Sequence, residues 1–339
     1  MTSDTYTAFS GRYDLLPGRR CGRSGIVLPV LSFGLWHNFG AGDDHRIARH
    51  MIRYAFDHGV THFDLANNYG PPPGSAEQLF GQIMVEDLRP YRNELIISSK
   101  AGHEMWPGHY GNNCSRKSLM ASIDESLLRT QLEYFDIFYT HRYDGVTPIE
   151  ETARALADIV KSGKALYAGI SKYPPAEAAE IYRLLREYGV PCLISQYRYN
   201  MFERAPENSA IPMAAEAGSG FIAFSPLAQG VLTNRYLEGI PADSRAARPT
   251  GFLKREQVTE EKISIVKALA PIAAERGQSI AQMALVWVLR DRRVTSVIVG
   301  ASSTEQLAAN IEAGKNTGFS DNELAAIDQA LQGGHRHKE

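Results

Sequence analysis

The 339-residue sequence predicts a single (β/α)8 barrel of the TIM type, with an N-terminal flap and a C-terminal helix. Strand-like and helix-like segments alternate, the strands number eight, and no GxGxxG or GxxxxGK[ST] fingerprint follows an early strand. Alternation predicts parallel strands with right-handed crossovers, and eight such units close a barrel. An open doubly wound sheet, the alternative, would need the fingerprint. We expect one domain over 1–339, with its core at about 30–332 and a tail at 333–339.

The composition indicates an ordinary globular protein that acts on a small molecule. Hydrophobic residues make up 44% of the chain and charged residues 22%, and the net charge of −2 gives no reason to expect nucleic acid or a membrane surface as a partner. Cys21, Cys114 and Cys192 show no CxxC spacing, which argues against a disulfide framework or a zinc site. No N-terminal run combines basic residues with an apolar segment as a signal peptide does, and no apolar run approaches the roughly 20 residues that span a bilayer. We therefore expect a cytoplasmic protein without a bound metal.

Eight short apolar segments are the predicted barrel strands, and the Gly-, Arg- and Pro-rich segment before about Val30 predicts a flap or hairpin. The segment 95–100 is a nearly continuous apolar run, which is typical of a parallel strand buried on both faces. The predicted strands are 31–36, 61–64, 95–100, 134–141, 165–171, 192–197, 220–228 and 294–302.

Helical periodicity and capping residues define the segments between the strands. In the first helix, Ile47, Met51, Ile52 and Ala55 form the predicted apolar face. Ser115 is the predicted N-cap of the third, and Thr147 with Glu150 has the spacing of a capping box before the fourth. The loop at 229–258 is long enough to predict a functional or disordered segment. The predicted helices are 43–58, 75–88, 115–132, 148–162, 175–188, 210–217, 260–276, 279–291, 304–313 and 320–331.

Four ionisable side chains of four types fall at three adjacent strand ends. Asp64 ends the second strand, Tyr69 lies on its loop, and Lys100 and His141 end the next two strands. The active site of such a barrel lies at the C-terminal ends of its strands, so these groups should meet. Each alone has an ordinary structural explanation, as an ion pair, a surface aromatic or a strand-end histidine. Their joint placement favours a catalytic site.

The four residue types suit proton transfer. A buried lysine needs a partner, and Asp64 is the obvious one for Lys100. A cation beside Tyr69 would lower the phenol pKa from about 10 toward working pH, as a general acid and base requires. His141 could orient a substrate carbonyl. A metal-dependent hydrolase is the alternative, since His62 and Asp64 alternate on one strand face, but no further His or carboxylate cluster is present.

The segments HFDLANNYG, SSK and YTH closely resemble signature segments of the aldo-keto reductases, in order, and the resemblance extends from about residue 12 to 331. GLW, YFDIFYTHR, SPLAQGVLT and GASSTEQL are most similar to the branch of bacterial L-glyceraldehyde 3-phosphate reductases and potassium-channel β-subunits. The resemblance implies NADPH-dependent carbonyl reduction: the pro-R hydride passes to an aldehyde carbon and Tyr69 donates the proton. A slow-turnover NADPH-binding regulatory or interaction subunit is the second hypothesis. Channel subunits have Asn where this chain keeps His141, which favours a reductase.

The resemblance also implies a cofactor-binding set that includes Trp36 and Asp64. Ser171 and Gln196 match positions that bind the nicotinamide carboxamide, and Tyr199 resembles the aromatic residue that stacks on the ring. Arg235 and Arg245 lie where basic residues cover the pyrophosphate, on a loop expected to close like a lid. The pyrophosphate segment matches Ser225, Pro226, Leu227, Gln229 and Gly230, and the adenine-ribose positions match Gly300, Ser302, Gln306 and Asn310.

Three residues depart from the family pattern: Ser303 replaces a frequent Arg, Ala309 a frequent Glu, and Lys172 an Asn or Arg beside the nicotinamide. The first two leave the choice between NADP and NAD open. We expect small polar aldehydes as substrates, such as glyceraldehyde 3-phosphate or methylglyoxal-like compounds, and the branch makes a homo-oligomer, a tetramer or larger, possible. The expected substrate pocket contains Trp36, Tyr69, Trp106, His141 and Arg142, with His103 and His109 on nearby loops.

Overall fold

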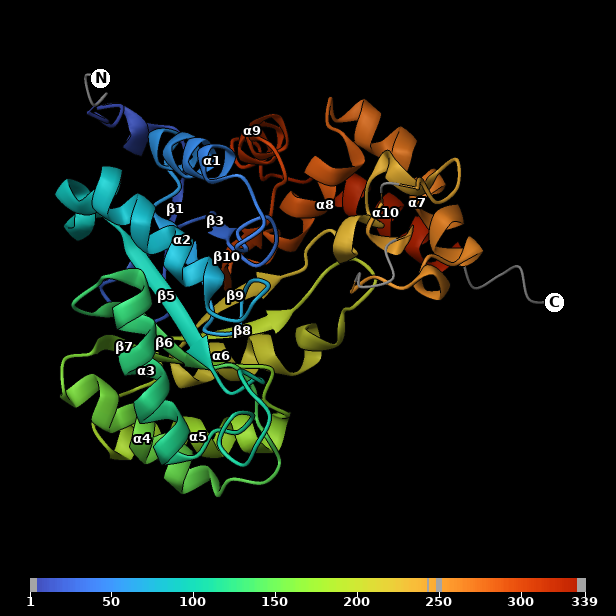
Figure 1. Cartoon of the computed structure of the whole chain (residues 1–339). Helices are drawn as coiled ribbons and strands as arrows, with labels where there is room; N and C mark the ends of the chain where they lie inside the picture. Colours follow the sequence, from blue (N-terminus) through green and yellow to red (C-terminus); the bar gives the residue numbers. More distant parts are fainter. Residues whose placement is uncertain (1–4, 243, 248–251, 334–339) are drawn as a thin grey trace.

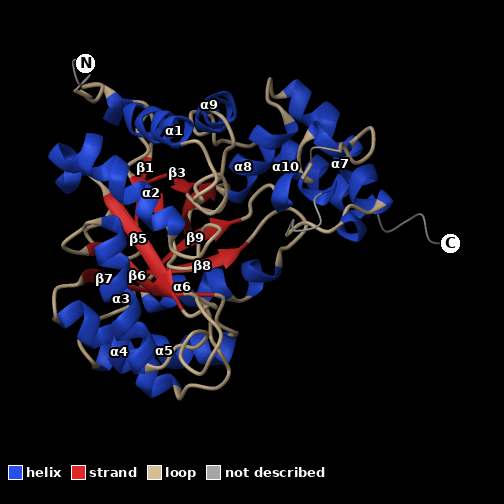
Figure 2. Cartoon of the chain, viewed as in Figure 1, coloured by secondary structure: helices blue, strands red, loops and turns tan. Residues whose placement is uncertain are grey.

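A closed barrel of eight parallel strands forms the centre of the computed structural model, which describes residues 5–242, 244–247 and 252–333. Neighbouring strands follow the order β10-β3-β4-β5-β6-β7-β8-β9, and helices enclose them (Figures 1 and 2). The predicted barrel is confirmed. The strands are β3 (Leu31–Gly34), β4 (His62–Asp64), β5 (Ile96–Ala101), β6 (Phe135–Thr140), β7 (Ala165–Ser171), β8 (Ile194–Arg198), β9 (Gly220–Phe224) and β10 (Val294–Val299).

The predicted N-terminal flap is an antiparallel hairpin of β1 (Gly18–Arg20) and β2 (Val27–Pro29). Leu28 packs in one cluster with Ile137 and Ile222 from the barrel strands. The thiol of Cys21 contacts the Leu193 carbonyl oxygen, just before β8 begins, at 3.4 Å. The hairpin therefore covers the N-terminal end of the barrel and leaves the C-terminal end for the site.

The helices bury one face each, against the strands or against a neighbouring helix. In α1, Ala48, Met51, Ile52, Ala55 and Phe56 are buried, whereas Ile47 is 51% exposed, so its predicted place on the apolar face was wrong. The bounds are α1 (His45–Asp57), α2 (Ser75–Ile83), α3 (Arg116–Thr130), α4 (Ile149–Lys161), α5 (Pro175–Glu187), α6 (Ala210–Ala217), α7 (Glu260–Glu275), α8 (Ile280–Val288), α9 (Thr304–Ala313) and α10 (Asp321–Gly333).

The predicted helix caps have different outcomes. Ser115 caps α3 as expected, because its hydroxyl accepts from the backbone N–H of Ser118 at 3.3 Å. The capping box at Thr147 was wrong: α4 begins after Pro148 without a side-chain cap. The Thr147 hydroxyl instead donates to Asp144 at 2.7 Å. The Asp144 carboxylate, three residues earlier, is a charged acceptor, and its hydrogen bond with the Thr147 hydroxyl turns that side chain toward the loop instead of the helix.

Several strands end earlier than predicted, which lengthens the loops around the C-terminal end. β3 ends at Gly34, β9 at Phe224 and β10 at Val299. Helix α2 continues as a π-helical turn, Met84–Leu88, inside the predicted helix 75–88. None of the described helices is long and apolar enough to cross a membrane.

Candidate active site

Asp64 and Lys100 form a buried ion pair at the C-terminal end of β4 and β5. The Lys100 ammonium donates to Asp64 Oδ2 and to the Leu65 carbonyl oxygen, both at 2.6 Å, and its side chain is fully buried. The other carboxylate oxygen accepts from the Ser98 hydroxyl at 2.7 Å and from the Gln196 amide at 3.2 Å. The predicted ion pair is confirmed, and its surplus lone pairs are satisfied, as a buried pair requires.

Tyr69 lies next to this pair, with its hydroxyl 3.4 Å from the Lys100 ammonium. Burial and then the Asp64 charge raise the pKa of Tyr69 well above its usual value. The expected lowering by Lys100 was therefore wrong, because desolvation of the phenol, together with the Asp64 charge, outweighs the effect of the lysine. Burial also lowers the pKa of Lys100 itself. At neutral pH the phenol stays protonated, which is the form that a proton donor needs.

His141 follows β6 and faces the phenol edge-on, with ring centroids 5.8 Å apart. Burial, followed by the charges of Lys100 and Lys172, lowers the pKa of His141 well below its usual value, so the imidazole is neutral at pH 7. Its Nδ1 is buried and has no hydrogen-bond partner within the described residues. A buried nitrogen without a partner is unfavourable unless a ligand supplies one.

A column of buried polar side chains continues from Asp64 into the barrel. Ser98 links Asp64 to His62 Nε2 (3.1 Å), and His62 Nδ1 contacts the Ser32 hydroxyl at 2.8 Å. Ser32 and Ser296 share a hydrogen bond of 2.7 Å. Both imidazole nitrogens are therefore engaged by hydroxyls, so His62 does not serve a metal. The described part of the chain contains no group of three or more His, Cys, Asp or Glu side chains that could hold one.

Ser171 and Gln196 are paired neighbours at the ends of β7 and β8. The Ser171 hydroxyl is fully buried yet unbonded among the described side chains, and Gln196 is fixed by Asp64. A hydroxyl and an amide side by side match the donors and acceptors of a carboxamide. The residues thus fit the nicotinamide that the sequence predicts for this place.

Tyr199 is the predicted cofactor residue that the structure places elsewhere. It is fully buried, its ring packs edge-on to Phe221, and its hydroxyl accepts from Arg290 at 2.7 Å and donates to Glu207 at 2.9 Å. Tyr199 is three residues after the inward-facing Gln196, and side chains alternate along a strand, so it faces the helices. The half-buried Phe224, which ends β9 and packs against the interior cluster, is an aromatic ring at the mouth.

The predicted phosphate-binding residues lie in two loops. After β9, Ser225 and Gln229 have positive φ values of 54° and 58°, and Gly230 has 100°. Arg235 is exposed, whereas Arg245 begins a half-buried 3-10 turn. Pro226 and Leu227 complete the first loop, and Gly300, Ser302, Gln306 and Asn310 lie in or before α9.

At α9, Ser303 rather than Ser302 is the N-cap: its hydroxyl accepts from the Gln306 backbone N–H at 3.3 Å. Ser302 donates its hydroxyl to the Gln306 side chain at 3.0 Å. Asn310 is buried in the helix, whereas Ala309 is exposed. The departure at Ser303 thus has a structural role, and it leaves two hydroxyls at a helix N-terminus, where anions are favoured.

Trp36 borders the mouth, with its ring 6.2 Å from that of Tyr69. Phe252, from the long loop, packs on Trp36 at 4.7 Å; the sequence analysis missed it, because nothing in the loop sequence marks the contact. Trp106 and His109 lie exposed on the 102–114 loop.

Arg142 is also predicted to line the pocket, and in the structure its side chain is hydrogen-bonded to the 102–114 loop. Its guanidinium donates to the Gly102 carbonyl oxygen at 2.9 Å and to the Asn112 side chain at 2.8 Å. These acceptors are uncharged, so no carboxylate among the described residues neutralises the guanidinium, and its geometry is fixed. Arg142 therefore holds the 102–114 loop and places a positive charge beside the mouth.

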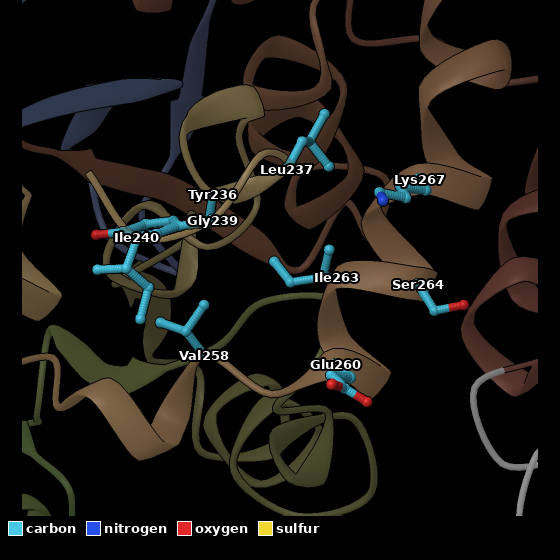
Figure 3. A pocket seen from close by; sticks show the side chains of 9 residues that line it. All are labelled: Tyr236, Leu237, Gly239, Ile240, Val258, Glu260, Ile263, Ser264 and Lys267. Atoms are coloured by element: carbon cyan, nitrogen blue, oxygen red, sulfur yellow. The ribbon is translucent and has the colours of Figure 1, made fainter.

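A hollow of about 440 Å³ lies outside the barrel mouth, between the long loop and α7 (Figure 3). None of the four catalytic candidates lines it. Its walls are Tyr236, Leu237, Gly239, Ile240, Val258, Glu260, Ile263, Ser264 and Lys267.

Known proteins are similar to this chain along nearly its whole length. Residues 30–332 match the Aldo/keto reductase family. The chain is 53% identical over 327 residues to L-glyceraldehyde 3-phosphate reductase of Escherichia coli (strain K12), which covers 95% of the chain and 94% of that relative. It is 36% identical over 301 residues to a probable voltage-gated potassium channel subunit beta of Oryza sativa subsp. japonica, covering 87% and 90%.

The fold is also that of a solved relative. The holo form of an aldo-keto reductase from Bacillus halodurans superposes with a TM-score of 0.75 at 24% identity, over 93% of this chain and 96% of that one. At this identity the likeness concerns the fold, whereas the family model and the sequence relatives carry the assignment. The chain therefore belongs to the aldo/keto reductase family and is an oxidoreductase.

Proposed function

We propose that the protein reduces small aldehydes to alcohols with NADPH, and that Tyr69 is the general acid. The observation that carries the proposal is the contact of the Tyr69 hydroxyl with Lys100, at 3.4 Å, in a mouth that His141 also faces. A phenol with a raised pKa is protonated at neutral pH, and the neighbouring ammonium stabilises the negative charge that develops on its oxygen as the proton leaves.

Each of the other catalytic residues has a task that its contacts support. His141, neutral and short of a partner, can hydrogen-bond the carbonyl oxygen beside the Tyr69 hydroxyl. Asp64 holds the Lys100 ammonium through a bond of 2.6 Å, so the charge stays at one point beside the phenol. Donors fixed before the reaction need little reorganisation in the transition state.

The residues fit a nicotinamide cofactor, and aldo-keto reductases generally use NAD(P)H. When bound, the cofactor supplies the hydride. Ser171 and Gln196 would hold the carboxamide, and Phe224, in place of Tyr199, would contact the ring. The loop after β9, with Arg235 and Arg245, would hold the pyrophosphate. Ser302 and Ser303, at the α9 N-terminus, support binding of the 2′-phosphate and hence NADPH over NADH.

Small polar aldehydes such as glyceraldehyde 3-phosphate or methylglyoxal are the proposed substrates. The similarity to a reductase named for the first of them supports this choice. Cys21, Cys114 and Cys192 are all unpaired, which supports a reducing cytoplasmic location. We also propose that the chain forms a single barrel domain and that it assembles into a homo-oligomer.

A panel of aldehydes, assayed with NADPH and NADH in parallel, tests the function. We expect NADPH oxidation to depend on aldehyde and enzyme, with a higher kcat/KM for NADPH than for NADH. Equal kcat/KM values for the two cofactors would contradict the assignment of the α9 serines but not the reductase activity.

The similarity to a channel subunit beta favours a second candidate, a regulatory or interaction subunit that binds NADPH. Tight NADPH binding without measurable turnover across the panel would support it. The same result would remove the reductase proposal.

A further inference from the structure

Lys172 is a cation at the barrel mouth that the proposed proton transfer does not use. It follows Ser171 at the end of β7, and its ammonium lies 2.8 Å from His103 Nε2. Its backbone has a φ of 58°, in the left-handed region that residues other than glycine seldom adopt. Such conformations concentrate at functional sites, where surrounding structure maintains them.

His103 connects this ammonium to the catalytic groups. Its ring packs edge-on against His141 with centroids 4.4 Å apart, and His141 in turn faces Tyr69. Burial and the charges of Lys172 and Arg142 lower the pKa of His103 to about 4. His103 is therefore neutral at pH 7 and accepts from the ammonium, which places the imidazole proton on Nδ1.

The charges around Lys172 favour an anion that the protein does not supply. Within the described residues, Lys172 has no ion pair with a carboxylate, whereas Lys100 is paired with Asp64 and Arg198 contacts Glu203 at 3.4 Å. Arg142 adds a further positive charge, because its partners are neutral. Lys172 is exposed, and an anion that enters the mouth would relieve the repulsion between these cations.

We propose that Lys172, positioned by His103, binds the phosphate of a short phosphorylated aldehyde whose carbonyl oxygen lies between Tyr69 and His141. This inference rests on the proposed function and specifies its substrate class. Ring contacts connect Tyr69 to His141 and His141 to His103, and His103 contacts the Lys172 ammonium, so the cation lies on the same side of the mouth as the proposed carbonyl site. Methylglyoxal, which has no anionic group, would gain nothing from Lys172.

The ratio of kcat/KM for glyceraldehyde 3-phosphate to kcat/KM for glyceraldehyde tests the role of the ammonium. Because the ratio is taken within each variant, it cancels effects on folding and on NADPH. We expect Lys172→Met to lower it about tenfold to a hundredfold, the range for a charge-assisted hydrogen bond. Lys172→Arg should restore most of it, and Lys161→Met, at an exposed lysine that ends α4, should leave it unchanged. An unchanged ratio in Lys172→Met would overturn the proposal.

A pH profile separates binding by charge from a structural role. Desolvation of the ammonium by the surrounding protein, followed by the charges of Lys100, Arg142 and Arg198, lowers the pKa of Lys172 to about 8. The ammonium is charged below this pH and neutral above it, so the ratio should fall as the pH rises through about 8. The fall should be absent in Lys172→Arg, and its persistence there would contradict the assignment. The titratable and charged groups around the ammonium are Lys100, His103, Cys114, His141, Arg142 and Arg198.

Binding of glycerol 3-phosphate to the enzyme with NADPH distinguishes failure of this inference from failure of the proposed function, because the ligand has the phosphate but no reacting carbonyl. We expect Lys172→Met to weaken it by a similar factor and glycerol to show no difference between wild type and variant. Equal affinity of wild type and Lys172→Met for glycerol 3-phosphate would overturn the subsite, even if the wild type reduces glyceraldehyde. A weakened NADPH affinity with an unchanged ratio would assign Lys172 to the cofactor instead.

Discussion

Two buried histidines of the barrel, His62 and His141, differ in their hydrogen bonding. Burial lowers the pKa of both, so both are neutral at pH 7. Both nitrogens of His62 contact serine hydroxyls, whereas Nδ1 of His141 has no partner among the described residues. The polar column below Asp64 has its hydrogen bonds satisfied and therefore stabilises the fold. The mouth above Asp64 keeps polar atoms without partners among the described residues, which is typical of a ligand-binding site.

Asp64 is the boundary between the two regions. One of its oxygens accepts from Ser98, whose hydroxyl also contacts His62 in the barrel interior. The other accepts from Lys100, whose ammonium contacts Tyr69 at the mouth. Substitutions above Asp64 should therefore reduce turnover, and substitutions below it should reduce stability. Three predictions test this division.

Removing the proposed proton donor should have the largest effect. Tyr69→Phe should lower kcat for aldehyde reduction by about 10²- to 10⁴-fold, the usual contribution of a positioned general acid, with little change in the midpoint of urea unfolding. Tyr143→Phe is the matched control, since Tyr143 is a half-buried tyrosine that packs on Tyr173 with ring centroids 5.8 Å apart. Near-normal turnover by Tyr69→Phe would show that another group donates the proton.

Breaking the pair at the boundary should affect both properties. Lys100→Met leaves the Asp64 carboxylate buried without its cation, so we expect a loss of about 3–5 kcal/mol in the free energy of unfolding as well as lost turnover. Adding Asp64→Asn should recover part of the stability but none of the turnover. Urea unfolding and NADPH oxidation measure the two effects. Full stability of Lys100→Met alone would contradict a charged pair.

The role of His62 in the polar column should be visible in how the free energy of unfolding depends on pH. Burial lowers the pKa of His62 from 6.5 to about 4, so between these values the unfolded chain binds more protons than the folded one. The stabilising effect is complete above pH 6.5 and is lost as the pH falls toward 4, by up to about 3 kcal/mol. In His62→Gln this part of the acid sensitivity should disappear, as urea unfolding at a series of pH values would reveal. An identical pH dependence in the variant would mean that other groups cause it.

Much of the fold and the grouping of the four candidate residues could be predicted because both depend on local patterns. Apolar runs separated by amphipathic helices fix a (β/α)8 barrel, and in a barrel the strand ends must meet, so Asp64, Tyr69, Lys100 and His141 could be grouped before any coordinates. Ser115 was recognised as a cap for the same reason, since a cap depends on residues three apart. The prediction that Tyr199 contacts the cofactor could have been avoided, because alternation of side chains from the inward-facing Gln196 turns Tyr199 toward the helices.

What the sequence determined by itself is therefore the order of the strands, the location of the site and the residue types gathered there. Only the tertiary structure decided that the pKa of Tyr69 is raised, that Phe252 covers Trp36, and that Lys172 contacts His103. These features depend on desolvation and on contacts between residues distant in the chain. Desolvation is set by everything that surrounds a group, and that surrounding exists only once the barrel has closed.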